Sequence, residues 1–274
     1  MVTYERRCPL QAGAPQVFSW HKRPGAFGRL TPPWPKLVLL KQSGTIHNDD
    51  SLVFGIQIGP FMLQWHTNHS NYAENVLFVD TQTKGPFKSW KHEHHFIPRG
   101  SNHSEIVDKV ICSLPFSFLS EPVLGPFLKR RLDLLFHHRH KQLQSDMGRH
   151  QAYTTQPKLK VAITGTNGLV GGALFDFLST GGHSVYKLLR NPTQTDTNSI
   201  FWDPSEGIIE SDRLENLDAI IHLGGHNIAA GRWTPAEKEK IRTSRIQSTQ
   251  LLADTIHILK SPPKIFMVAS AIGY

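Results

Sequence analysis

Apolar and polar residues are interspersed along residues 1–115 in short runs that are typical of β-strands. Turn-forming segments such as "KGP" and "RGSN" separate several of these runs. The predicted strands are 3–10, 36–44, 51–59, 61–70, 76–85, 89–100 and 104–115. A short helix is expected after Ala14 and should end near Pro24, because proline lacks a backbone donor. This pattern predicts an antiparallel sheet.

A helical period replaces the strand pattern near residue 125. Within 125–147, apolar residues recur at three- and four-residue spacing, and most basic residues fall on the other face. The apolar positions are Phe127, Leu128, Leu132, Leu135 and Phe136. Such a helix must bury its apolar stripe against the sheet. We therefore predict an α+β domain over residues 1–150.

In the second half, strand-like and helical segments alternate. The polar stretch 148–157 reads as a linker. The main predicted strands are 159–163, 184–190, 218–223 and 264–270, with a further strand–turn–strand segment near 199–210. The helix over 233–259 has clear start signals: Thr234 as N-cap, Pro235 at the first helical position, and Glu237 completing a capping box. Alternation of this kind predicts an α/β, Rossmann-like parallel sheet over residues 158–274.

Composition narrows the class of protein. The 274 residues are 39% hydrophobic and 19% charged, which is ordinary for two globular domains. No apolar run reaches the roughly 18 residues of a membrane span, and the start has no signal-peptide pattern, so a cytoplasmic protein is expected. The net charge of +8 lies mostly in the first half, but it is scattered and no nucleic-acid-binding motif accompanies it. Cys8 and Cys112 are expected to be buried free thiols.

Histidine is abundant, and "HEHH" at 92–95 invites a metal interpretation. On a strand, His92 and His94 share one face and His95 points to the other. A zinc site needs at least a third ligand, and none is apparent, so we favour a polar strand face and predict no metal. In "WHTNH", His66 and His69 would face opposite sides of their strand.

The strongest motif is "VAITGTNGLVGG" at 161–172. Gly165, Gly168 and Gly171 follow a strand and open a helix, which is the setting of a dinucleotide-binding loop. The first glycine permits the turn, the second admits a pyrophosphate, and the third lets helix and strand pack closely. The loop residues Asn167, Leu169 and Val170 are counted with the cofactor site.

Two further features favour a dinucleotide. Arg190 ends the second predicted strand, where NAD-binding sites carry an acidic residue; a guanidinium suits a 2′-phosphate, so NADP is favoured over NAD. The alternative is a solvated strand-end arginine. "DAIIHL" at 218–223 ends at Gly224, which leaves room for the cofactor unless that glycine serves packing alone.

"TGTNGLVGGAL", "LDAIIHLGG", "GRWTPAEKEKIRTSRIQSTQLL" and "MVASAIGY" together resemble the atypical short-chain dehydrogenase/reductases of the epimerase family. "VFSWHKRPGAFGRLTPPW", "GPFKSWKHEHHF" and "LFHHRH" resemble the helix-grip domain of the START/polyketide-cyclase-like (SRPBCC) superfamily, which is fused ahead of such reductases in some bacterial proteins. The second resemblance implies a pocket for a hydrophobic ligand. The first implies NAD(P) contacts at the glycines, Leu223, Gly224 and Arg245, and a substrate-polarising Ser270.

The catalytic pattern of that family is incomplete here. None of the five tyrosines, Tyr4, Tyr72, Tyr153, Tyr186 and Tyr274, has a lysine four positions later. The chain stops directly after a core strand, so we expect it to be truncated at its C-terminus. One hypothesis is an NADP-dependent epimerase, reductase or dehydratase that acts on a small molecule. The alternative is a non-catalytic NADP-binding or sensing module coupled to a hydrophobic-ligand domain.

Overall fold

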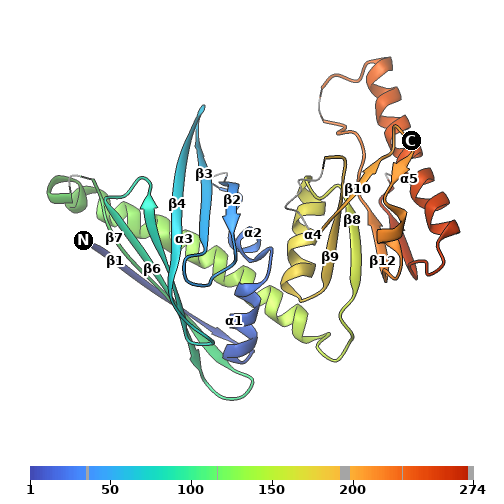
Figure 1. Cartoon of the computed structure of the whole chain (residues 1–274). Helices are drawn as coiled ribbons and strands as arrows, with labels where there is room; N and C mark the ends of the chain where they lie inside the picture. Colours follow the sequence, from blue (N-terminus) through green and yellow to red (C-terminus); the bar gives the residue numbers. More distant parts are fainter. Residues whose placement is uncertain (35–36, 116, 192–197, 230, 271–274) are drawn as a thin grey trace. The chain divides into compact units, whose positions relative to one another are not determined.

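The computed structural model describes residues 1–34, 37–115, 117–191, 198–229 and 231–270. The chain divides into two compact units, Met1–Thr155 and Gln156–Tyr274, which are described separately (Figure 1). Within the described residues, no helix is long and apolar enough to cross a membrane.

The first unit is built on an antiparallel seven-stranded sheet. Its strands are β1 (Val2–Leu10), β2 (Leu37–Ser43), β3 (Ser51–Ile58), β4 (Phe61–Ala73), β5 (Leu77–Lys84), β6 (Ser89–Pro98) and β7 (Ser104–Ser113). Their order in the sheet is β1-β7-β6-β5-β4-β3-β2, so only β1 is displaced from sequence order. Each predicted strand is confirmed to within a few residues.

Three helices complete this unit: α1 (Ala14–Lys22), α2 (Ala26–Leu30) and α3 (Ser117–Gln151). The sheet wraps around the long α3 (Figure 1). Leu132 and Phe136 are buried against the sheet as predicted, but Phe127 is 64% exposed, so its place in the buried stripe was wrong. The predicted linker was also wrong at its start, because 148–151 continue α3.

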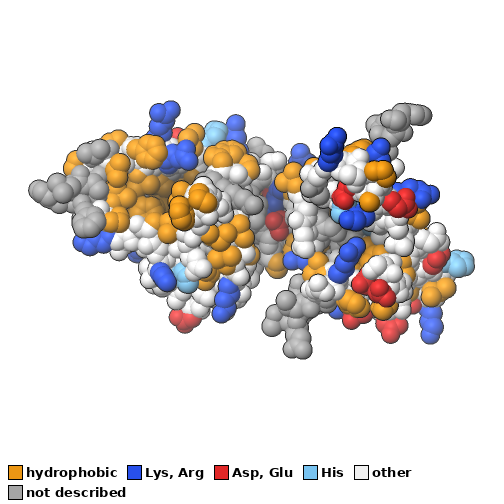
Figure 2. All heavy atoms as spheres, turned by 90° about the horizontal axis from the view of Figure 1, so that it is seen from above, with side chains coloured by type: hydrophobic (Ala, Val, Ile, Leu, Met, Phe, Trp, Pro, Cys, Tyr) orange, Lys and Arg blue, Asp and Glu red, His pale blue; other side chains and the backbone are white. Residues whose placement is uncertain are grey.

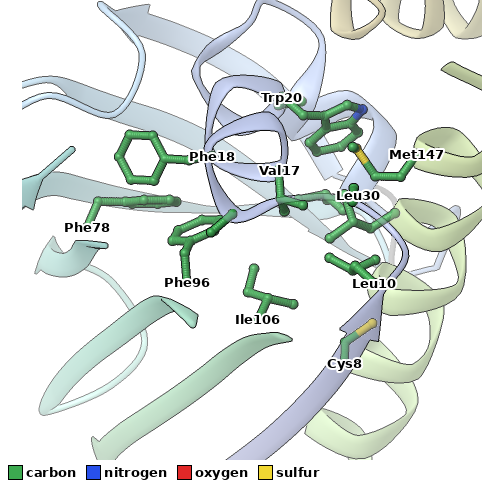
Figure 3. Close-up of a cluster of buried hydrophobic side chains, with 14 of the residues drawn as sticks. Cys8, Leu10, Val17, Phe18, Trp20, Leu30, Phe78, Phe96, Ile106 and Met147 are labelled. Carbon is green, nitrogen blue, oxygen red and sulfur yellow. The ribbon is translucent and has the colours of Figure 1, made fainter. Parts of the chain in front are cut away.

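Aromatic side chains form much of the core near α1. Phe18 of α1 meets Phe96 of β6 edge to face, with ring centroids 4.9 Å apart, and Phe78 of β5 stacks beside Phe96 (Figure 3). Cys8 and Cys112 are buried free thiols, as predicted. Burial raises the pKa of Cys8 to about 12 and that of Cys112 to about 11.

The second unit contains a six-stranded sheet. Its elements are β8 (Lys160–Thr164), α4 (Leu169–Thr180), β9 (Ser184–Leu189), β10 (Ser199–Asp203), β11 (Ile208–Ile209), a 3₁₀ turn (Ser211–Leu214), β12 (Ala219–His222), α5 (Pro235–Ile258) and β13 (Ile265–Val268). The order is β11-β10-β9-β8-β12-β13. All neighbouring pairs are parallel except β10 and β11, so the sheet is mixed rather than wholly parallel.

Alternating residues of the central strands cover the two faces of this sheet. Val161 and Ile163 of β8 pack with Phe175 of α4, whereas Ala162 between them belongs to the cluster that contains Leu252 of α5. One helix therefore covers each face. The chain proceeds from β8 outward through β9 and β10 and then returns to β12 on the other side of β8. In open α/β sheets, ligands bind at the carboxyl ends of the strands where the order reverses in this way.

Candidate nucleotide-binding site

The turn between β8 and α4 requires glycine at its first position. Gly165 has φ of +73°, a left-handed conformation that strains any residue with a side chain. A β-carbon there would also lie 2.9 Å from Leu223 O, in the neighbouring strand connection. Gly171 is tighter still, because its β-carbon would lie 2.2 Å from Gly165 O. The start of α4 is thus pressed directly onto the end of β8.

Backbone groups dominate the start of α4. Its N-cap is Gly168, with φ −87° and ψ 167°, and no side chain within the described residues caps this end. The first N–H groups of a helix lack intrahelical acceptors and carry a partial positive charge. Leu169 and Val170 are 92% and 66% exposed, so the helix start faces open space. It therefore has the features of an anion-binding helix terminus.

A cavity of about 970 Å³ lies at the carboxyl ends of β8, β9 and β12. Among the predicted site residues it is lined by Gly165, Asn167, Arg190 and Gly224. Within the described residues, the lining does not include Gly168, Leu169, Val170, Gly171, Leu223, Arg245 or Ser270. Residues from α5, including Thr243, Ser244 and Gln247, form the opposite wall and were not predicted.

Arg190, Arg245 and Ser270 occupy different settings. Arg190 is exposed at the end of β9, on the edge of the cavity. Arg245 is tied to the backbone: its Nη1 lies 3.0 Å from Ile241 O and 3.3 Å from His226 O, which holds the side chain beside Gly225. Ser270 is exposed two residues beyond β13. Tyr274 falls outside the described residues. The roles assigned to these side chains remain predictions.

The sequence offered no hint of a buried hydrogen-bond chain beneath the cavity. Thr164 Oγ1 accepts hydrogen bonds from Leu223 N at 3.0 Å and Gly224 N at 2.9 Å, and lies 2.6 Å from His222 Nδ1. On its other side, His222 Nε2 lies 2.9 Å from Ser248 Oγ. Burial, followed by the charge of Arg245, lowers the pKa of His222 to about 4. A neutral imidazole therefore joins β8, β12 and α5.

The N-terminus of α5 is capped as predicted, but only in part. Glu237 N donates to Thr234 Oγ1 at 3.2 Å, which confirms the N-cap. The Glu237 side chain does not complete the predicted capping box; it contacts His226 Nε2 instead. The hydrogen bond from His226 lowers the pKa of Glu237. This contact fixes the segment after Gly225 to the helix that forms one wall of the cavity.

The first unit encloses a second cavity, of about 370 Å³. Its lining is mostly apolar and rich in aromatic rings, among them Phe27, Phe54, Trp65, Phe78, Phe87 and Trp90. Figure 2 shows apolar side chains gathered over one face of this unit. The lining also includes His69, Asp80, His92 and His94. His92 and His94, which were expected to lie on a polar strand face, are buried, at only 3% and 2% exposed.

A glycine turn between a strand and an uncapped helix, opening on a cavity where the strand order reverses, is the arrangement of nucleotide-binding α/β units. Comparison with known proteins confirms the resemblance to the epimerase family, to which this chain is related. The epimerase family protein ML0860 of Mycobacterium leprae is 33% identical over 117 residues, which make up 43% of this chain and 37% of that protein. No protein-family model matches the chain.

Two solved structures extend this comparison. The nucleoside-diphosphate sugar epimerase of Corynebacterium glutamicum is 31% identical, with a TM-score of 0.75 over 100% of this chain and 55% of that one. Both units therefore have a counterpart in that protein. Human epimerase family protein SDR39U1, solved with NADPH, is 30% identical over 42% of this chain and 38% of its own, with a TM-score of 0.36. The chain thus spans between 37% and 55% of the length of these relatives.

Proposed function

We propose that the second unit is a Rossmann-like domain that binds NADP, and that the chain carries the cofactor-binding part of an NADP-dependent epimerase or oxidoreductase acting on a small molecule. The observation that carries this proposal is the lack of room for a side chain at Gly171, where a β-carbon would lie 2.2 Å from Gly165 O. The loop residues Gly165 and Asn167, which line the 970 Å³ cavity, lead directly into a helix start that no described side chain caps. The NADPH of the solved human relative belongs to the same class of nucleotide.

In this proposal, different residues of the site bind different parts of the cofactor. Backbone N–H groups at 169–171 would bind the pyrophosphate, since Gly168 N already donates to Gly165 O at 2.9 Å, and Arg190 would bind the 2′-phosphate in two-point contact. Gly224 leaves space at the end of β12, since a β-carbon there would lie 3.0 Å from Thr164 Oγ1. The nicotinamide, when bound, supplies or accepts hydride. In this proposal Arg245 faces the nicotinamide side and Ser270 hydrogen-bonds the reacting oxygen of the substrate.

Calorimetric titration of the full chain with NADP⁺ and NAD⁺ tests the cofactor. We expect one NADP⁺ per chain, bound at least about tenfold more tightly than NAD⁺, since a charge-assisted contact contributes roughly 1.5–3 kcal/mol. Failure of both nucleotides to bind would remove the proposal. Tighter binding of NAD⁺ would overturn only the preference for NADP, and the dinucleotide site itself would stand. Hydride exchange with labelled NADPH across a substrate panel then tests the enzymatic assignment.

A second candidate function is favoured by the apolar cavity of the first unit. A non-catalytic module would bind NADP in one unit and a hydrophobic ligand in the other. Titration with a hydrophobic ligand, in the presence and absence of NADP⁺, distinguishes the two. Mutually dependent binding without hydride exchange supports the module, and independent binding with exchange supports the enzyme.

A further inference from the structure

A row of buried histidines and aspartates crosses the concave side of the sheet in the first unit, apart from the nucleotide site. Strand register sets His69 of β4 opposite Asp80 of β5, and Asp80 opposite His92 of β6. His94, two residues along β6, lies opposite Asp108 of β7. All but Asp80 are less than 9% exposed. So many titratable side chains in an aromatic interior require a common explanation.

We propose that Asp80, His92 and His94 bind a divalent transition-metal ion of the zinc type, as three protein ligands of an open site. Asp80 Oδ2 lies 2.9 Å from His94 Nε2 and 3.8 Å from His92 Nδ1, and one ligand atom from each residue fits within a 4.8 Å group. Atoms bound to one zinc ion at about 2.0–2.1 Å lie roughly 3 to 3.5 Å apart in tetrahedral or octahedral geometry. The three donors therefore need little rearrangement to share an ion.

The surrounding residues hold these donors in place. His92 uses its other nitrogen, Nε2, to contact Asp108 Oδ1 at 2.8 Å, and His94 Nδ1 lies 2.9 Å from the same oxygen. His140 of α3 contacts Asp108 Oδ2 at 2.6 Å. A carboxylate that receives the second N–H of a ligating histidine fixes the tautomer and the ring orientation that a metal requires. Asp108 Oδ1 is placed to do this for His92, whereas His94 Nδ1 lies near the same oxygen without hydrogen-bond geometry.

Two further contacts preorganise the site. His69 Nε2 lies 2.7 Å from Asp80 Oδ1, which leaves Oδ2 directed at His92 and His94. Phe78 stacks on the ring of His94, with centroids 4.1 Å apart and planes inclined by 17°. These contacts orient the Asp80 carboxylate and the His94 ring. Two histidines and one carboxylate are a donor set that suits zinc, iron(II) and manganese(II).

The open side of the site faces the apolar cavity. Asp80, His92 and His94 line that cavity, whereas Asp108 and His140 are not among its lining residues and lie behind them. Three protein ligands leave at least one coordination position for water or for a ligand atom, as in catalytic rather than structural zinc sites. The cavity would thus receive an apolar molecule that carries one metal-binding oxygen, such as a carboxylate or a hydroxyketone.

Zinc(II) titration of the full chain, with cobalt(II) as a spectroscopic substitute, tests this site. We expect one equivalent of zinc to bind and to raise the unfolding temperature. The Asp80→Asn and His92→Ala variants should bind at least about 100-fold more weakly, and Asp108→Asn about 10- to 100-fold more weakly. His95→Ala is the matched control, since His95 lies on the other face of β6 beside Glu93, and its zinc affinity should equal that of the wild type.

The wild-type cobalt(II) spectrum keeps the test decisive even if a variant fails to fold. Nitrogen and oxygen ligands predict weak visible bands and no thiolate charge-transfer band. A wild-type chain that takes up less than one equivalent, or that shows thiolate bands, overturns the proposal. So does full zinc affinity in folded Asp80→Asn and His92→Ala. In that case the row is a self-contained hydrogen-bonded network. Loss of NADP binding has no bearing on this result, because the two sites lie in different units.

Discussion

Thr164 Oγ1 lies 2.6 Å from His222 Nδ1, across the two strands between which the sheet order reverses. The hydroxyl has one proton and already accepts two backbone N–H groups, so it must donate to the imidazole. His222 is therefore protonated on Nε2, the nitrogen that faces Ser248. One hydroxyl thus aligns the backbone after β12 with the loop after β8.

Removing the Thr164 hydroxyl should destabilise the strand ends beneath the nucleotide-site cavity. The Thr164→Val variant leaves an imidazole nitrogen and two backbone donors without partners, and each buried unsatisfied group costs roughly 1–3 kcal/mol. We expect a loss of at least about 2 kcal/mol in unfolding free energy, with faster hydrogen exchange at Leu223 and Gly224. Thr164→Ser keeps the hydroxyl and serves as the control. Unchanged hydrogen exchange in Thr164→Val would show that the hydrogen bonds of Thr164 do not stabilise the loop after β12.

The glycine contact at the start of α4 makes a sharper prediction for binding. A methyl group at Gly171 must displace the Gly165 carbonyl, since its β-carbon would lie 2.2 Å from that oxygen. Gly171→Ala should therefore weaken NADP⁺ binding by at least about tenfold, equivalent to about 1.4 kcal/mol. Gly231→Ala is the matched control, because among the described residues no atom beyond its two chain neighbours lies within 4 Å of the added carbon. Equal affinities of the two variants in calorimetry would argue against this loop as the phosphate site.

Arg190 should determine which nucleotide binds. Its guanidinium stands at the cavity edge, where the 2′-position of a bound adenosine is expected. Arg190→Ala should lower NADP⁺ affinity about tenfold or more and leave NAD⁺ affinity within about twofold. Arg242→Ala, an exposed arginine of α5 outside the cavity lining, should change neither. An equal loss of both nucleotides would assign Arg190 to a general electrostatic role.

Acidification should destabilise the second unit through His222. Its pKa in the folded chain, about 4, lies below the roughly 6.5 of an exposed histidine, because burial and Arg245 disfavour the charged form. The unfolded chain therefore takes up the proton first, so stability is lost as the pH falls from about 6.5 toward about 4. The slope cannot exceed about 1.4 kcal/mol per pH unit for one proton.

Hydrogen exchange in β12, corrected for intrinsic rates, reports this loss without interference from the first unit. His222→Gln should flatten the pH dependence of exchange between about pH 7 and about pH 5. His257→Gln, at an exposed position of α5, should leave it unchanged. If the two variants show the same slope, another group controls acid sensitivity.

The elements were predictable because their signals are local. Strand runs, the Thr234 cap and the glycine spacing each depend on a few adjacent residues. The sites depend on register and on tertiary packing. His92 and His94 were seen to share a face, but Asp80 joins them only because β5 pairs with β6 in one particular register. Thr164 and His222 are isolated polar residues in otherwise apolar strands, Ser248 is one of several polar residues of α5, and only the packing of α5 on the sheet joins them.

The two cysteines are native probes of the opening of the first unit. Both are in the first unit, both are buried, and burial raises the pKa of both thiols far above neutrality. A thiol reagent can modify them only when that unit opens. The rate of thiol labelling therefore reports how often the first unit opens, and no probe has to be introduced. Zinc and NADP⁺ can then be compared on the same sample, since only a ligand of the first unit should slow the reaction.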